Sequence, residues 1–418
     1  MGAADIALIA GVVFVWGAFS ARLERFDVTA AIVFVAVGAL LAHLPRPAED
    51  LRPSPETIKV MAEVTLVLVL FSDASRVRFA DFRADLGLYA RLLGVGLPLT
   101  IALGTGTAYA LYPDVGIWPA LLVGAALAPT DAALGASLMS DHSVPARIRR
   151  LINVESGLND GIATPFVMLA IAGASSAEAT KNSGLGAALI ELALGVIVGI
   201  GVGGLGGELL RRARRRAWSA DGFAGPAVLG LALCAYATSV AVDGNGFIAA
   251  FVAGTAFGNL SGRESQRLVP FLEEAGGLAS LLVWLLFGAV AVVPAVENLT
   301  WQVGVYAVLS LTALRMIPVA VACAGAGLSR ATVAFVGWFG PRGLASVIFA
   351  LLALEEIGGS SGPALTIIAI TVLLSVLAHG ITAGPLATRY SAYMAREKTA
   401  PEHTSKPELP PRALTRRI

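Results

Sequence analysis

The sequence predicts an all-α polytopic membrane protein with about thirteen transmembrane helices and two broken, crossing helices in inverted repeats. The first reason is composition: 56% of the 418 residues are hydrophobic, only 14% are charged, and the mean hydropathy is +0.76, far more apolar than a soluble protein. The second is length, because the apolar residues form runs of about 20 residues, enough to cross a bilayer. The third is charge, since lysines and arginines gather in every second gap between these runs.

The predicted spans follow from the apolar runs. The first begins without the basic region that precedes a cleaved signal sequence, so we expect it to be retained. The two spans within 223–258 are short and separated only by a brief polar turn. The spans lie near residues 3–20, 27–44, 57–73, 87–112, 117–139, 147–172, 185–210, 223–241, 244–258, 266–294, 300–326, 331–355 and 361–386.

The basic residues predict the orientation. With the N-terminus outside, almost all of them fall on the cytoplasmic side, and only Arg46, Arg52 and Lys181 fall on the other side. An odd number of spans then places the C-terminus inside, followed by a short cytoplasmic polar tail (391–418) that we expect to be disordered. The cytoplasmic groups are Arg22, Arg25, Arg76, Arg78, Arg83, Arg147, Arg149, Arg150, the run 211-RRARRR-216, Arg263, Arg267, Arg330 and the tail.

No motif predicts a cofactor. The stretch 201-GVGGLG-206 has the spacing of a dinucleotide fingerprint, but it lies in an apolar helix with no strand before it. Cys234 and Cys323 lie in apolar segments and suggest neither a disulfide nor a metal site. We interpret His379 as a packed core histidine and 211-RRARRR-216 as a cytoplasmic anchor, with anionic-lipid binding as the alternative.

Glycines recur on one face of the same helix. Gly195, Gly199, Gly203 and Gly207 are four residues apart. Small side chains on one stripe let a second helix approach closely. We therefore expect another helix to pack along this stripe.

Five charged residues remain in the middle of spans: Asp131, Glu155, Asp160, Arg315 and Arg342. Each costs roughly 2.5–3.5 kcal/mol to insert, so such groups are usually functional or paired. Three carboxylates face two guanidinium groups, which leaves one carboxylate without a fixed partner. That carboxylate must hold a proton or a small cation, and a site that takes one or the other couples their movements in opposite directions, as in antiport.

Two prolines predict broken helices. Pro129 precedes Thr130 and Asp131 in one span, and Pro341 precedes Arg342 in another. The two spans run in opposite directions, which is typical of inverted-repeat transporters, whereas two unrelated kinks would leave the charges unexplained. We expect Asp131 to balance the positive N-termini of the half-helices, and Arg342 their negative C-termini.

The segment 153-NVESGLNDGIATP-165 carries two polar stripes. Residues four apart share a helix face, so Glu155 stacks with Asn159, and Ser156 stacks with Asp160. The carboxylate of one stripe can form an ion pair within the protein, while the other stripe binds a mobile ion. A second carboxylate beside Asp160 would add one more titrating charge per cycle, but Asn159 is a neutral amide. We therefore expect one proton to exchange for one monovalent cation.

These residues together resemble a known family, the NhaP-type branch of the monovalent cation:proton antiporters, which includes the animal sodium/proton exchangers. The resemblance covers roughly residues 5–390 and implies a homodimer in which a core moves as an elevator. Spans 1–3 and 8–10 would form the dimerisation part, spans 4–6 and 11–13 the core, and span 7 the connector. The motifs are Thr130-Asp131, 155-ESGLND-160, 244-GNGFIAAFVAG-254, Arg315 in LRMIPV, 337-GWFGPRG-343 and 375-SVLAHGITAGPLA-387.

The resemblance assigns a role to each residue. Asp160 resembles the aspartate that binds the cation and the proton, with Asn159 and Ser156 shaping the site and Thr130 adding an oxygen ligand.

The other charges would be structural. Glu155 would pair with Arg315, while Asp131 and Arg342 would stabilise the helix crossing. Asp73, near a span end, is a secondary candidate for the ion path. Glu273 and Glu274 are expected in an ion funnel or at a helix end.

The resulting hypothesis is an electroneutral exchanger of Na⁺ for H⁺ in the cell membrane, with Li⁺ or K⁺ as possible substrates, rather than an enzyme. A K⁺/H⁺ antiporter on the same fold stays open, because selectivity depends on fine cavity geometry. A channel and a transport-inactive sensor or scaffold are further alternatives. Broken inverted helices argue against the channel, and the intact Asp160 site argues against the sensor.

Overall fold

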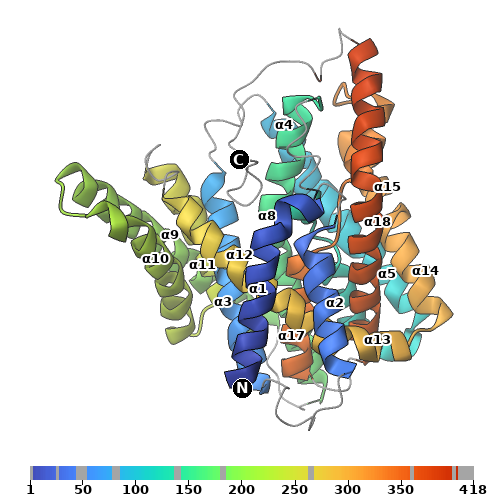
Figure 1. Ribbon diagram of the computed structural model, residues 1–418, viewed down its shortest axis with the longest axis horizontal. Coiled ribbons are helices and arrows are strands. Elements are labelled where there is room, and N and C mark those ends of the chain that lie inside the picture. The colour runs from blue at the N-terminus through green and yellow to red at the C-terminus, as the bar shows by residue number, and fades with distance from the viewer. Residues whose placement is uncertain are drawn as a thin grey trace.

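The computed structural model describes residues 3–24, 28–43, 54–77, 85–135, 143–178, 185–261, 268–357, 362–397 and 402, and every regular element in them is helical (Figure 1). The α-helices are α1 (Ala3–Glu24), α2 (Ala30–His43), α3 (Pro55–Arg76), α4 (Leu86–Arg91), α5 (Leu97–Leu111), α6 (Ile117–Ala126), α8 (Ala146–Glu178), α9 (Leu185–Arg215), α10 (Asp221–Ala241), α11 (Gly246–Leu260), α12 (Val269–Phe287), α13 (Val293–Glu297), α14 (Trp301–Leu311), α15 (Ala313–Cys323), α16 (Arg330–Trp338), α17 (Leu344–Ile357) and α18 (Gly362–Arg396). Short π and 3₁₀ elements are η2 (Leu92–Gly96), η3 (Pro113–Val115), η4 (Ala132–Gly135) and η6 (Gly288–Val292).

The all-α prediction is confirmed for these residues, and each predicted span coincides with one helix or with a run of shorter helices. Eight segments of the described chain are long and apolar enough to cross a membrane by length and composition. The count of thirteen spans stays a prediction. Figure 1 shows α1 beginning and α18 ending at opposite ends of the molecule, as an odd number of crossings requires.

The expected start of the tail at residue 391 is wrong, because α18 continues to Arg396. Its last turns stay helical since Tyr390 and Met394 are buried in a hydrophobic cluster with Phe335. Of the remaining tail only Glu397 and Glu402 are described. Arg25, Arg46, Arg52, Arg78, Arg83, Lys181, Arg263 and Arg267 lie outside the described residues.

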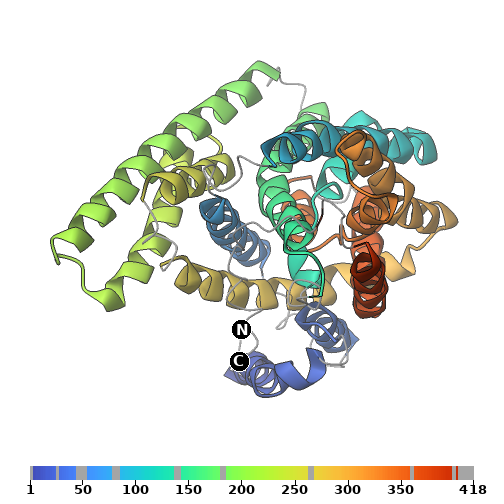
Figure 2. The same cartoon turned by 90° about the horizontal axis from the view of Figure 1, so that it is seen from above.

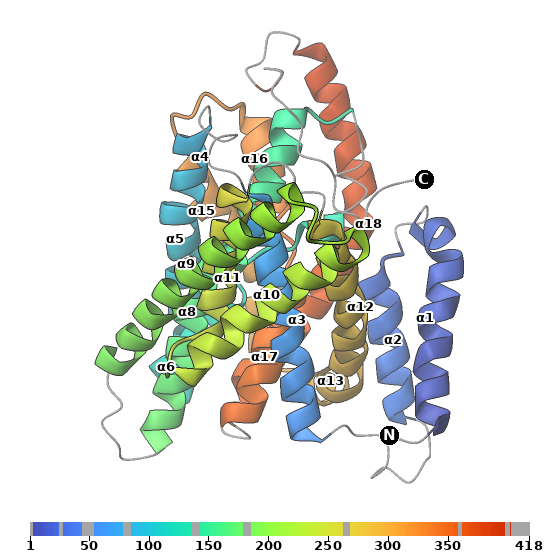
Figure 3. The ribbon, with the colours of Figure 1, turned by 90° about the vertical axis from the view of Figure 1, so that its left-hand side faces the viewer.

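The helices form two groups with α3 and α12 between them. Seen from above, α9, α10 and α11 lie on one side, and α5, α14, α15 and α18 lie on the other (Figure 2). From the side, α9 and α10 cross obliquely in front of α11 and α3 (Figure 3). The core clusters lie between these helices and bury mostly Ala, Val, Leu and Phe side chains.

The predicted glycine stripe of α9 packs on α11. A Cβ added at Gly195 would lie 2.6 Å from the Asn245 carbonyl oxygen, and one at Gly199 would lie 2.7 Å from the Ala249 carbonyl oxygen. Only glycine allows the two backbones to come this close. The expectation of a closely packed helix is confirmed. The stretch 201-GVGGLG-206 lies within this helix, and its Gly203 is at the seam.

Both predicted helix breaks are present. The first, which we call break 1, runs from Leu127 to Asp131 between α6 and η4; the second, break 2, runs from Phe339 to Gly343 between α16 and α17. Each contains its proline at a position where no helical hydrogen bond is needed. A third interruption lies at Thr312 (φ −114°, ψ −96°), between α14 and α15, and no proline or glycine adjoins it to predict it.

Replacing Gly199 with alanine should destabilise the protein. The new methyl group would force α9 and α11 apart, which we expect to cost about 1–3 kcal/mol. Gly201→Ala is the matched control, because it lies on the same helix with nothing within 4 Å of an added Cβ. Thermal unfolding in detergent should show a lower midpoint for Gly199→Ala alone; equal midpoints for the two variants would contradict the packing.

Candidate cation site

The two helix breaks lie against each other. The backbone N–H of Asp131 in break 1 donates to the carbonyl oxygen of Pro341 in break 2, at 2.8 Å. The Asp131 carboxylate accepts a hydrogen bond of 3.2 Å from the N–H of Leu344, the first residue of α17. A carboxylate at a helix N-terminus meets the positive end of the dipole. Asp131 therefore joins break 1 to the start of the second half-helix.

Arg342 joins the breaks from the other side. Its side chain is fully buried and donates to the carbonyl oxygens of Ala128 (2.9 Å) and Pro129 (3.3 Å), just beyond the end of α6. A third bond of 3.0 Å reaches the Ser310 carbonyl, which the interruption at Thr312 releases from the helix. Arg342 thus neutralises carbonyl groups at helix ends.

Two glycines of 337-GWFGPRG-343 allow this close packing. A Cβ at Gly340 would lie 2.5 Å from Nε of Arg315, and one at Gly343 would overlap the side chain of Asp131. Any larger residue would push the two charged groups away from the crossing. The sequence motif is therefore explained by close approach.

Glu155 and Arg315 form a buried bidentate ion pair. The guanidinium nitrogens lie 2.6 Å and 2.9 Å from the two carboxylate oxygens. The side chains are only 4% and 3% exposed, so each charge depends on the other. The pair fastens α8 to α15.

Three polar contacts tie α8 to break 1. The Ser156 hydroxyl donates to the Thr130 carbonyl oxygen (2.6 Å) and accepts from the Ala132 N–H (2.8 Å). The Asn159 amide donates to Thr130 Oγ1 (2.7 Å). Both Thr130 oxygens are therefore engaged by α8. Thr130 and Asn159 are not among the lining residues of the cavity described next.

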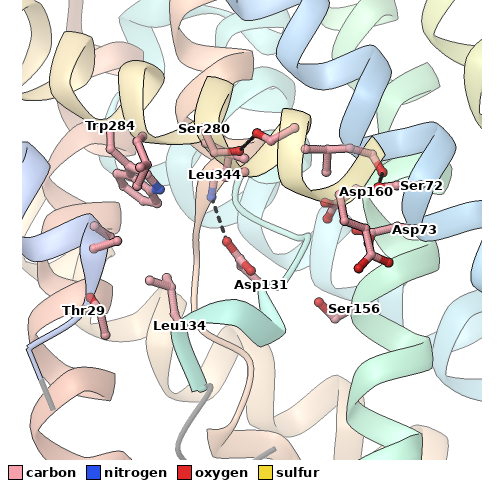
Figure 4. A pocket seen from close by; sticks show the side chains of 17 residues that line it. Thr29, Ser72, Asp73, Asp131, Leu134, Ser156, Asp160, Ser280, Trp284 and Leu344 are labelled. Carbon is pink, nitrogen blue, oxygen red and sulfur yellow. Dashed lines mark hydrogen bonds between the residues drawn. The ribbon is translucent and has the colours of Figure 1, made fainter. Parts of the chain in front are cut away.

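A cavity of about 190 Å³ opens in front of α8 (Figure 4). Four of its described lining residues are acidic, namely Asp73, Asp131, Asp160 and Glu273, and none is basic. Figure 4 shows Asp73, Asp160 and Ser156 toward one end, with Thr29 and Trp284 toward the other. The rest of the lining is Ala30, Ala31, Val69, Ser72, Leu134, Gly276, Gly277, Ser280, Leu281 and Leu344.

Asp73 and Glu273 come to the cavity from α3 and α12. Asp73 lies next to α8, since a Cβ at Gly157 would lie 3.6 Å from the Asp73 Cβ. Glu273 forms an ion pair with Arg76 (2.8 Å) at the end of α3. The structure thus brings Asp73, the secondary candidate, together with Asp160. Glu273 lines the same cavity.

The cavity suits small hard cations. Carboxylate and hydroxyl oxygens are the ligands that such cations prefer, and the acidic lining gives the space a negative potential. A carboxylate in an apolar environment is costly unless a cation or a proton neutralises it. Asp160 lines the cavity beside Ser156, so it can accept either.

Sequence analysis missed the hydroxyls of Thr29, Ser72 and Ser280 in the lining. Ser72 and Ser280 also donate to carbonyl oxygens of their own helices, at 3.0 Å and 2.7 Å. Serine within apolar helices is common for that reason, so no local signal marks these residues.

Comparisons with known proteins bear on this site. The model of the family described as "Sodium/hydrogen exchanger, transmembrane" matches residues 8–389. A K⁺/H⁺ antiporter NhaP2 of Shewanella sp. (strain MR-4) is 28% identical over 267 residues, which are 63% of this chain and 46% of that protein. A Na⁺/H⁺ antiporter of Schizosaccharomyces pombe is 28% identical over 343 residues, covering 72% of this chain and 70% of that protein.

The fold is also similar to solved structures. The sodium proton antiporter MjNhaP1 of Methanocaldococcus jannaschii superposes with a TM-score of 0.73 at 17% identity, over 92% of this chain and 98% of that one. The chain spans about half of the length of the NhaP2 relatives.

Removing one partner of the Glu155–Arg315 pair should destabilise the protein strongly. Arg315→Ala leaves a buried carboxylate unpaired, which we expect to cost about 3–5 kcal/mol, whereas Arg212→Ala should cost at most about 0.5 kcal/mol because Arg212 is 68% exposed. Thermal unfolding of both variants measures this. The double variant Glu155→Leu/Arg315→Met should recover much of the loss, and no recovery would show that charge pairing is not the cause.

Proposed function

Because the chain belongs to the sodium/hydrogen exchanger family, we propose that it exchanges a monovalent cation for a proton across a membrane. The observation that carries the proposal is the position of Asp160 in an acidic cavity lined by residues of α2, α3, α8, α12, α17 and break 1. Na⁺ is the first candidate cation, and Li⁺ could take its place.

Asp160 is the proposed carrier of both ions. When ionised, its carboxylate binds the cation together with Ser156 and oxygens of the cavity; when protonated, it is neutral and releases the cation. Two ions that compete for one carboxylate must travel in opposite directions. Asn159 is neutral, so we infer that one positive charge moves each way and that exchange is electroneutral.

Four other central charges make contacts that join helices. Glu155 is bound by Arg315, and Asp131 accepts the N–H at the start of α17. Arg342 is engaged by three carbonyl oxygens. These contacts support structural roles for the four residues.

The cavity is lined by residues of both proposed parts of the protein, so movement of one part against the other would change its access to the two sides of the membrane. Its lining comes from α2, α3 and α12, which belong to the proposed dimerisation part, and from break 1, α8 and α17, which belong to the proposed core. A core that slides against the other part would open this space alternately to the two sides, as in elevator transport. We propose this movement, a homodimer formed by the first part, and a location in the cell membrane with the C-terminus in the cytoplasm.

A second candidate is K⁺/H⁺ exchange at the same site. It is favoured by the names of relatives, since NhaP2 of Shewanella and NhaP of Alkalimonas amylolytica are both described as K⁺/H⁺ antiporters. Carboxylate and hydroxyl oxygens accept either ion. Proteoliposomes that carry a pH gradient, challenged in turn with Na⁺, Li⁺ and K⁺, separate the two candidates.

Asp160→Asn should abolish cation-dependent collapse of the pH gradient in proteoliposomes, because an amide can neither release a proton nor balance a cation. Its unfolding temperature should stay near that of the wild type. Asp243→Asn is the matched control: Asp243 is exposed in the turn before α11, and its positive φ of 56° suits asparagine. Wild-type exchange by Asp160→Asn would overturn the assignment.

The exchange rate should not depend on membrane potential. If one proton is exchanged for one monovalent cation, no net charge crosses the membrane in a cycle, so imposed positive and negative potentials should give equal rates. Proteoliposomes clamped with a K⁺ gradient and valinomycin measure this for Na⁺. A rate that rises steadily with potential of one sign would refute the stoichiometry.

A further inference from the structure

Helix α18 presents three polar side chains to break 2. Ser375, His379 and Thr382 follow the spacing i, i+4, i+7, so they lie on one stripe of the helix. Sequence analysis treated His379 as a packed core histidine and gave no role to the other two. All three contact residues that flank break 2.

The contacts hold both ends of the break. Toward the C-terminal end of break 2, the Ser375 hydroxyl accepts a hydrogen bond of 2.7 Å from the N–H of Arg342. Just before its N-terminal end, His379 Nε2 lies 2.9 Å from the carbonyl oxygen of Trp338, and the Trp338 indole donates to Thr382 Oγ1 at 3.1 Å. Ser375 and His379 are 0% and 1% exposed, so water cannot replace these bonds.

These are backbone groups that a helix break leaves without helical partners. The Arg342 N–H lies in the extended segment, where no preceding carbonyl is in place for it. The Trp338 carbonyl ends α16 and, among the described backbone contacts outside the helices, accepts the N–H of Gly340 (2.7 Å). His379 Nδ1 lies 2.9 Å from the Ser375 carbonyl oxygen and 3.3 Å from the Ser375 hydroxyl, so both ring nitrogens face oxygen atoms of the chain. Because a carbonyl oxygen can only accept, the bond to break 2 forms when Nε2 carries a proton.

A short series of contacts leads from this stripe to Asp160. In break 2, the Pro341 carbonyl oxygen accepts a hydrogen bond from the Asp131 N–H, and the Arg342 side chain donates to the carbonyl oxygens of Ala128 and Pro129. Break 1 is in turn held by Ser156 and Asn159, which flank Asp160 along α8. A displacement of break 2 would therefore pass to break 1 and to the oxygen ligands around the cavity.

We propose that Ser375 and His379 are positioning residues for the cation site: by fixing both ends of break 2, they hold break 1 and Ser156 in the geometry that binds the cation. This inference rests on the proposed exchange function. Neither residue touches the cavity, so their effect must pass through the crossing. Loss of a group hydrogen-bonded directly to a metal ligand typically costs 10–100-fold in affinity. Ser375 and His379 act through the two breaks, at a greater distance from the ligands, so we expect an effect at the lower end of this range.

The test compares Ser375→Ala with Thr371→Val. Thr371 lies one turn earlier on α18, is equally buried, and donates only to the Ile367 carbonyl of its own helix (2.7 Å). In proteoliposomes, Ser375→Ala should raise the KM for Na⁺ about tenfold while the maximal rate changes much less. Thr371→Val should keep the wild-type KM. Equal KM values for the two variants would overturn the proposal.

Variants of His379 provide a second, independent test of the proposal. His379→Ala should raise the KM for Na⁺ as Ser375→Ala does, whereas in His379→Gln the amide N–H can reach the Trp338 carbonyl and should restore most of the affinity. A glutamine variant no better than the alanine variant would contradict positioning by Nε2, and so would an alanine variant with wild-type KM. Size-exclusion profiles and unfolding temperatures identify any variant that does not fold, and the other position then decides.

The same assay separates the two proposals. If wild-type protein shows no cation-dependent proton movement, the exchange function itself fails. If wild-type protein is active and every α18 variant keeps its KM, only the positioning role fails.

Discussion

In an apolar environment a broken helix exposes backbone groups that water cannot satisfy, and the site depends on how this chain satisfies them. Break 1 and break 2 supply partners for each other: Asp131 binds the N-terminus of α17, and Arg342 binds the carbonyls beyond α6 and at the end of α14. Side chains of α8 and α18 complete the arrangement. The result is a crossing in which the two breaks, α8 and α18 are joined by buried hydrogen bonds.

At this crossing the carboxylates of Glu155 and Asp131 hold helices together, whereas we propose that the carboxylate of Asp160 binds ions. Glu155 is neutralised by Arg315, and Asp131 by a helix dipole, so neither needs a mobile ion. Asp160 instead faces an acidic cavity that Asp73 and Glu273 share. The acidic lining attracts cations into the space between the proposed dimerisation part and the proposed core.

Much of this could be predicted from sequence. Pro129 and Pro341 predicted the breaks, and the glycine spacing predicted the seam between α9 and α11. The charge count left one central carboxylate over, and the family resemblance pointed to Asp160, which stays a prediction. The interruption at Thr312 could not be predicted, because it depends on Arg342 from another span taking the Ser310 carbonyl. Nor could the roles of Ser375 and His379, or the place of Thr130 outside the cavity lining, since each depends on contacts between helices far apart in the chain.

The most direct test of the central claim is whether cation binding displaces a proton from Asp160. Calorimetric titration of the purified protein with Na⁺, in two buffers that differ in ionisation enthalpy, measures the protons released on binding. At a pH where Asp160 is protonated, competition predicts a buffer-dependent heat and proton release in the wild type. Sodium binding with no proton release at any pH, or the same release from Asp160→Asn, would contradict it.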